Sequence, residues 1–221
     1  MSGPVSSLTL DVIAPTPAPA WFAAWPLAEK IAARRAHALK GISIVLTPYE
    51  RRHGDALRAL RNQPHNRINL AQTGELTAGN QRAWEDGYFA RTNDVNWIVL
   101  TPAHEFAGAV ALYDITATEG ETGRLVLRED IARSSPAIAE CELMIQWLAF
   151  TWLGLRRVLA RIQPDNTKMV AMHERLGFVA VGPSEIRGIP YVQFEATAEN
   201  FNLGPHLKVL QHWRARAPAA R

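Results

Sequence analysis

The chain has 221 residues, of which 48% are hydrophobic and 20% are charged, and its formal net charge is +3. This length predicts one domain, or one domain with an appendage, and the composition is typical of a globular protein. The Arg residues are scattered, so no dense basic block indicates a nucleic-acid partner. The single cysteine, Cys141, excludes an intramolecular disulfide and has no metal-ligand spacing around it, so we expect no metal.

Targeting signals are also missing from the sequence. No segment reaches about 18 consecutive apolar residues, and the first residues do not combine a basic region with an apolar run. We therefore expect a cytoplasmic protein without a membrane span.

Residues 1–41 are predicted to form an N-terminal extension. Its first half contains the run PTPAPA and is predicted to be disordered or extended, and a helix is expected over 27–40. Between them stand three aromatic residues: Trp21, Phe22 and Trp25. The extension could be a mobile arm, an element on a membrane surface, or a segment packed on its own domain or on a partner subunit. We favour packing, because large exposed apolar side chains are costly in water. A homodimer is left open.

The next segment shows a regular alternation of elements. Thr47-Pro48-Tyr49-Glu50 has the pattern of a capping box, with Thr at N-cap, Pro at N1 and Glu at N3. In chain order, the pattern predicts a strand over 42–46, helices over about 47–62 and 77–91, and strands over 95–100, 107–115 and 123–128.

The second half begins with a helix over 137–153 that is apolar nearly all round, with polar exceptions that include Glu142, so we expect it to be buried on most sides. Strands are predicted over 157–162, 178–181 and 191–195, and a helix over 166–175. Strands from 95 to 128 can pair as an antiparallel meander, whereas the strand–helix–strand connection from 123 to 162 requires parallel pairing. The fold class is therefore α/β (α+β), with a mixed, mostly antiparallel sheet of about seven strands flanked by about four helices.

One motif is more specific than these patterns. The stretch NTKMVAMHERLGF begins at Asn166, a good helix N-cap, and Gly177 stands where a helix ends in a left-handed turn. It resembles the C-terminal acetyl-CoA-binding motif of the GNAT acyltransferases, the Gcn5-related N-acetyltransferases. The predicted order of elements is also that of this family, which implies a GNAT-like domain over 42–198 and a C-terminal tail over 199–221.

Two further stretches are similar to one branch of the family. AGAVALYDITATEGETGRLVLRED resembles the strand pair of ribosomal-protein-alanine acetyltransferases and PseH-like enzymes, which acetylate an amino group of a nucleotide-linked sugar. NQRAWEDGYFARTNDVNWIVL resembles the second helix and following strand of the same branch.

The resemblance implies where acetyl-CoA binds. In the family, its pyrophosphate lies in a loop [Q/R]-x-x-G-x-[G/A] before a helix N-terminus, where free N–H groups and the helix dipole favour an anion. Here Pro136 and Ile138 stand where small residues are usual, and Pro removes a donor. Ser135 and Pro136 could instead simply begin a helix as N-cap and N1. The predicted phosphate-binding residues are Arg133, Ser134, Ser135, Ala137 and Ile138.

The pantetheine arm of acetyl-CoA pairs in this family like an extra strand, through backbone groups that here belong to Leu125, Val126 and Leu127. Asn166 matches the family's cofactor-binding Asn. Asp114 is the candidate base for the amine, ahead of Glu119 and Glu121 in the predicted loop after it. His173 stands where the family usually has Tyr, and it is the candidate acid for the departing thiolate.

We therefore expect an N-acetyltransferase that moves an acetyl group from acetyl-CoA to a primary amine, on a small molecule such as a nucleotide-linked amino sugar. A protein N-terminus is the second choice of acceptor. The alternative class is a GNAT-shaped binding or assembly protein without catalysis, favoured by Pro136, Ile138 and His173.

Overall fold

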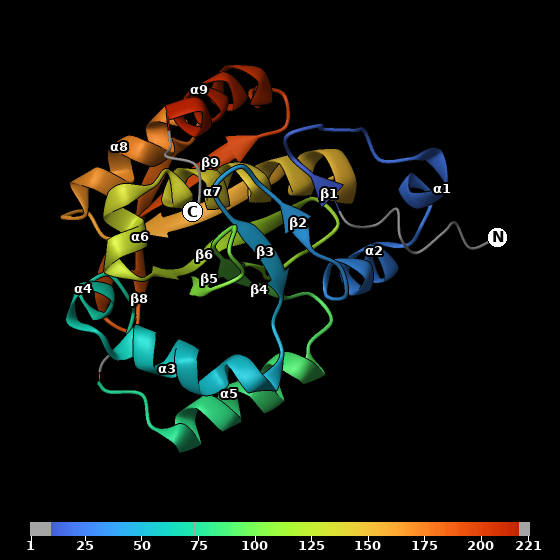
Figure 1. Ribbon diagram of the computed structural model, residues 1–221. Coiled ribbons are helices and arrows are strands. Elements are labelled where there is room, and N and C mark those ends of the chain that lie inside the picture. Colours follow the sequence, from blue (N-terminus) through green and yellow to red (C-terminus); the bar gives the residue numbers. More distant parts are fainter. Residues whose placement is uncertain (1–9, 73, 217–221) are drawn as a thin grey trace.

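A computed structural model describes residues 10–72 and 74–216. Within this part, a nine-stranded sheet has the order β1-β2-β3-β4-β5-β6-β7-β9-β8 (Figure 1). The strands are β1 (Leu10–Asp11), β2 (Leu39–Lys40), β3 (Val45–Pro48), β4 (Val95–Leu100), β5 (Phe106–Tyr113), β6 (Glu119–Leu127), β7 (Arg157–Ile162), β8 (Val179–Ile186) and β9 (Ile189–Thr197). The helices are α1 (Ala20–Ala23), α2 (Leu27–Arg34), η2 (Arg51–His53), α3 (Gly54–Asn62), α4 (Pro64–Arg67), α5 (Ala78–Ala90), α6 (Glu129–Ser134), α7 (Ala137–Trp147), η3 (Leu148–Leu153), α8 (Thr167–Arg175) and α9 (Leu203–Arg216).

The predicted mixed, mostly antiparallel sheet is confirmed. Only β1–β2 and β6–β7 pair in parallel, and the β6–β7 pair is joined through α7, as the crossover argument required. In the described chain, the two strands beyond the expected seven are β1 and β2. Each has two residues, too few to show any alternation in the sequence.

Helices cover both faces of the sheet. In Figure 1, α3 and α5 lie on one side, and α7, α8 and α9 lie on the other. Side chains of α3, α5, β4, β5 and β6 form the smaller hydrophobic cluster, while the larger one includes most of α7 and η3. The predicted burial of the apolar helix is confirmed, and its last turns are a π-helix that ends at Gly154 in the left-handed conformation.

The N-terminal extension packs on its own domain in its described part. Phe22 is 0% exposed, and its ring lies 5.1 Å from that of Trp152 in η3. Trp21 and Trp25 are partly buried beside it. Of the two expected states of the start, disordered or extended, Leu10–Asp11 has the extended one, because β1 joins the sheet and buries Leu10; residues 1–9 lie outside the described residues. No described helix is long and apolar enough to cross a bilayer.

One local prediction is wrong, and one segment contains a helix that the sequence pattern did not indicate. Thr47 is not an N-cap but part of β3; the helix begins after Glu50, which exchanges capping hydrogen bonds with His53 instead. The predicted tail contains α9, on which Leu207 and Leu210 are buried. In both cases the position of an element depends on a partner distant in the sequence, which short-range patterns do not contain.

A buried carboxylate fixes the turn before β3. Glu140 of α7 is fully buried and accepts hydrogen bonds from the N–H groups of Ile42 and Ser43 and from the Ser43 hydroxyl. The turn therefore depends on a side chain that lies almost a hundred positions later in the chain.

We expect Glu140→Ala to lower the free energy of unfolding by about 2–3 kcal/mol, because two buried N–H groups would lose their acceptor. Urea denaturation followed by tryptophan fluorescence measures this. Glu29→Ala, on the exposed side of α2, serves as the control and should change stability by less than about 0.5 kcal/mol. Equal stabilities for the two variants would contradict the role of Glu140.

Candidate active site

The two parallel strands at the centre of the sheet separate along their length. β6 and β7 are paired from Glu119 and Arg157 to Thr122 and Ala160, and beyond this point the two strands continue without pairing to each other. The cause lies in a β-bulge. Arg124 and Leu125 of β6 both stand opposite one residue of β5, and Arg124 has a positive φ of 53°. A bulge bends its strand, so β6 turns away from β7 and opens a splay.

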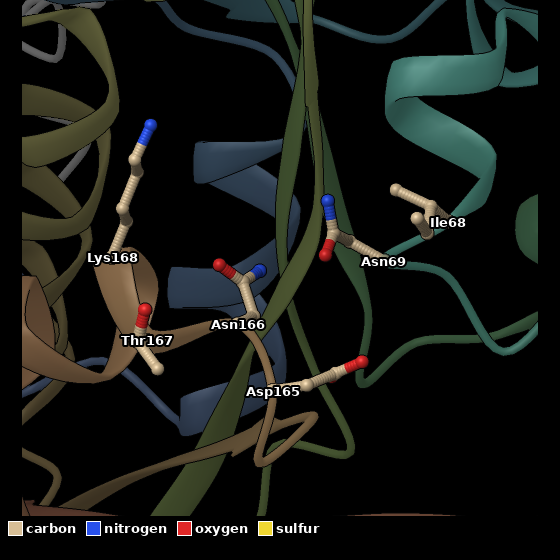
Figure 2. A pocket seen from close by; sticks show the side chains of 6 residues that line it. All are labelled: Ile68, Asn69, Asp165, Asn166, Thr167 and Lys168. Carbon is tan, nitrogen blue, oxygen red and sulfur yellow. The ribbon is translucent and has the colours of Figure 1, made fainter.

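A cavity of about 90 Å³ occupies this splay. Its walls come from β6, β7, α7, α8 and the segment after α4, and they include Thr122, Leu125, Glu142, Asn166 and His173. A second cavity, of about 220 Å³, shares Asn69 and Asn166 with it. Figure 2 shows Ile68 and Asn69 on one side of this second cavity and the start of α8, from Asp165 to Lys168, on the other.

The predicted motif builds one wall of the splay cavity. Asn166 is the N-cap of α8, and its side chain accepts a hydrogen bond of 3.3 Å from the Met169 N–H. Gly177 follows the helix with a φ of 88°, as predicted. Because residues three or four positions apart share a helix face, Asn166, Met169 and His173 all reach the cavity.

His173 is held in one orientation. It is 2% exposed, and its Nδ1 lies 3.0 Å from the Met169 carbonyl oxygen. A carbonyl can only accept, so Nδ1 carries a hydrogen and Nε2 is left for other chemistry. Nε2 lies 3.7 Å from Oε2 of Glu142.

Glu142 is the second ionisable group of this wall. It is 1% exposed, and it accepts a hydrogen bond of 2.8 Å from the Thr122 hydroxyl. Burial raises the pKa of the Glu142 carboxyl, while His173 and the Thr122 hydrogen bond act in the opposite direction. Sequence reasoning did not select Glu142 or Thr122 as site residues. The available signal was a carboxylate within a helix that is apolar nearly all round.

The three residues aligned with the pantetheine-binding strand differ in their surroundings. Leu125 lines the splay cavity, whereas Val126 is buried in the cluster beneath α3 and α5. The carbonyl of Leu127 already accepts hydrogen bonds of 3.2 Å from His65 and Asn66 of α4. The Leu127 carbonyl is therefore already occupied, and we expect the backbone groups that bind a ligand to lie nearer to Leu125.

The first two residues of the expected phosphate loop belong to a helix. Arg133 and Ser134 belong to α6, where Arg133 is exposed and pairs with Glu129. The hydroxyls of Ser134 and Ser135 donate to backbone carbonyls of α6. The hydroxyl hydrogens of Ser134 and Ser135 are thus used within the helix. These hydroxyls are therefore less able to replace the backbone donor that Pro136 lacks.

The N-terminus of α7 still offers donors to an anion. Pro136 is its N-cap rather than N1, and the Ala137 N–H donates to the Ser135 hydroxyl at 3.3 Å. The N–H groups of Ile138 and Ala139 belong to the first turn, where a helix has no acceptors of its own. Together with the exposed Arg133, they fit a phosphate group, although with fewer donors than a glycine-rich loop provides.

The carboxylates predicted near the acceptor lie in different places. Asp114 follows β5, is exposed, and is not among the residues that line either cavity. Glu119 and Glu121 are not in a loop but in β6. Glu121 is buried and binds Arg161 of β7 and the hydroxyl of Tyr113.

Residues 43–179, more than half of the chain, match the family model described as an acetyltransferase (GNAT) domain. The chain belongs to the GNAT acetyltransferase family. It is therefore an enzyme whose acyl donor is acetyl-CoA, and the predicted GNAT membership, fold and transferase class are confirmed. No curated protein matches this GNAT sequence significantly.

Solved structures share the GNAT fold over most of their length. A GCN5-related N-acetyltransferase from Brucella melitensis has a TM-score of 0.65 at 23% identity, over 81% of this chain and 86% of that one. Mycobacterium smegmatis RimJ in complex with CoA-disulfide gives 0.65 at 20% identity, over 76% and 89%. Spermidine N-acetyltransferase from Vibrio cholerae, in complex with CoA and spermine, gives 0.64 at 16% identity, over 72% and 97%. At these identities the likeness concerns the fold.

Proposed function

We propose that this GNAT enzyme acetylates a primary amine on a small molecule, such as a nucleotide-linked amino sugar, as in the branch of ribosomal-protein-alanine and PseH-like acetyltransferases. The observation that carries the proposal is the splay cavity, which brings the β6 strand, Asn166 and His173 of the motif to one place. One structural neighbour binds spermine and another is described only with CoA-disulfide, so the neighbours do not decide between a small molecule and a protein N-terminus.

In this proposal, acetyl-CoA binds in the splay and at the start of α7. Backbone groups near Leu125 and the Asn166 side chain would hold the pantetheine arm, and the N–H groups of Ile138 and Ala139 with Arg133 would face the phosphates. The helix dipole adds to the attraction for an anion at this end of α7.

His173 and Glu142 would manage the proton of the leaving group. When the amine nitrogen bonds to the acetyl carbon, the carbon–sulfur bond breaks and the electron pair leaves on sulfur. A proton held at Nε2 of His173 can be given to that sulfur, while Nδ1 keeps its hydrogen bond to Met169. Glu142 stabilises the protonated imidazole by its charge and position. Asp114 remains the predicted base for the amine, but it would act through solvent because it lies outside both cavities.

Acetyl-CoA binding tests the proposal directly. A ligand present at a hundred times its Kd stabilises the folded state by about 2.7 kcal/mol, so the Tm should rise. Arg133→Ala should weaken Kd by roughly tenfold, because a charge-assisted hydrogen bond is worth about 1.5–3 kcal/mol. Titration calorimetry measures both constants.

The matched control is Arg82→Ala, which removes one exposed positive charge on α5 and should leave Kd unchanged. If millimolar acetyl-CoA produces neither a Tm shift nor heat, the alternative of a binding or assembly protein is favoured. The homodimer also remains a prediction, and light scattering of the full chain would test it.

A further inference from the structure

Two arginines flank the point at which the central strands separate. Arg124 lies in the bulge of β6 and Arg161 lies near the end of β7, and both line the splay cavity. They stand on the two strands that diverge, one on each side of the opening. The splay cavity therefore has a cationic side chain on each of its two diverging strands.

Both guanidiniums are fixed in place by carboxylates. Nη1 of Arg124 donates to both oxygens of Asp94 at 2.9 Å, and its guanidinium lies 4.1 Å from the centre of the Tyr113 ring. Nε and Nη2 of Arg161 donate to the two oxygens of Glu121, at 2.9 and 2.5 Å. Among the described residues, neither Nη2 of Arg124 nor Nη1 of Arg161 has a protein acceptor. Each arginine thus keeps donors for a ligand.

A third arginine adds charge without a partner. Arg61, in the last turn of α3, makes no ion pair with any carboxylate of the described chain. Burial and, to a smaller extent, the positive charge of Arg124 lower the pKa of Arg61 to about 10, although Arg61 is not among the residues that line the splay cavity. It remains charged at neutral pH.

The neighbouring carboxylates do not neutralise these arginines. Asp94 also pairs with Arg91 at 3.1 Å, so one carboxylate serves two guanidiniums. Glu121 serves Arg161, with Asp114 farther away on the same side. Four guanidiniums therefore stand against three carboxylates.

Of the described residues that line the splay cavity, Glu142 is the only carboxylate, and it belongs to the His173 wall. Within the cavity, a cationic acceptor such as a polyamine would meet no carboxylate other than Glu142.

We propose that Arg124 and Arg161, whose positive charge Arg61 reinforces, select an acceptor amine that also carries a phosphate or carboxylate group. This inference rests on the proposed function and narrows its substrate class. Guanidinium groups bind such oxygens through two or more directed hydrogen bonds, which specifies both charge and geometry. The carboxylate partners hold Arg124 and Arg161 in position before the acceptor arrives, which lowers the entropy lost on binding.

The test compares amines that differ only in a phosphate. Glucosamine and glucosamine 6-phosphate form one pair, ethanolamine and phosphoethanolamine another, and spermidine represents a polycation. With acetyl-CoA as donor, kcat/KM for at least one phosphorylated amine should exceed that of its neutral twin by about tenfold or more, the value of one charge-assisted contact. Binding of each pair in the presence of CoA, measured by calorimetry, gives a second readout that does not require turnover.

Arg61→Gln should reduce the ratio of phosphorylated to neutral kcat/KM, because it removes a guanidinium whose loss leaves no buried carboxylate unpaired. Arg82→Gln changes the net charge equally and should leave that ratio unaltered. Arg124→Lys keeps the charge beside Asp94 but loses the fork, so it should also lower the ratio. These variants separate local recognition from a general effect of net charge.

The outcomes distinguish this inference from the proposed function. Equal kcat/KM for the phosphorylated and the neutral amine of each pair, or a higher kcat/KM for spermidine, would overturn the anionic acceptor. Either result would leave the proposed acetyl transfer intact. If Arg61→Gln and Arg124→Lys lower kcat equally for every acceptor, the arginines act on the thioester of acetyl-CoA instead. That result would also overturn the anionic acceptor. If no amine is acetylated, the proposed function fails in this form, and the binding of the phosphorylated twins alone decides the inference.

Discussion

Replacing His173 by Phe is expected to lower kcat by about 10²-fold, the low end for a general acid–base group. Phe keeps the ring that packs 4.7 Å from the Phe178 ring, so the loss should concern the proton rather than the fold. A thiol has an ordinary pKa of about 8.5, so an imidazolium can protonate the departing thiolate, whereas a neutral imidazole N–H is a poor donor. Single-turnover kinetics with acetyl-CoA and the best amine measure this.

His173→Tyr should retain substantial activity, because a phenol restores an acidic hydrogen at the position where the family usually has one. The control is His212→Phe, the same exchange at an exposed position of α9. An unchanged kcat in His173→Phe would make this residue a packing element of α8. A parallel loss in His212→Phe would point to an effect outside the site.

Replacing Phe22 by Ala is expected to lower the free energy of unfolding by about 3–5 kcal/mol, the usual cost of removing a fully buried aromatic side chain. The ring fills the space between α1 and η3, where it contacts Trp25 and Trp152. Its removal would also take an apolar face from the buried Arg34, whose guanidinium lies 5.5 Å from the Phe22 ring centre. Denaturant unfolding of the full chain gives the value.

Phe89→Ala deletes the same side chain at a position of α5 that is 41% exposed, and we expect it to cost far less. If the two variants unfold at the same denaturant concentration, the N-terminal segment contributes little to the stability of the domain. The extension would then be held to the sheet mainly by the pairing of β1 and β2.

The elements that sequence predicted well are those whose signals are local. The limits of β4 and β7 follow from short apolar runs, and α8 carries both its N-cap, Asn166, and its terminating Gly177 within one motif. The parallel pairing of β6 and β7 followed from connectivity alone. In these strands and this helix, the residues that determine where the element begins and ends are neighbours in the sequence.

The parts that sequence did not predict depend on distant partners. The Thr122–Glu142–His173 group joins β6, α7 and α8, and no spacing in the sequence relates these three positions. The same holds for Arg124, whose partner Asp94 lies thirty positions earlier. α6 extends to Ser134, into the segment aligned with the family's phosphate loop, because no glycine interrupts the helix before Pro136.

The bulge in β6 links two properties of the enzyme that might be thought independent. The bulge places one extra residue in β6, at Arg124 and Leu125, and this opens the strands. Arg124, which Asp94 holds in place, belongs to the same bulge. Removing that residue would allow β6 to run on beside β7, so the opening for the acyl group and a cationic contact would be lost in one step. A protein engineer who wishes to reverse the proposed charge preference should therefore substitute the side chain of Arg161 and leave the length of β6 untouched.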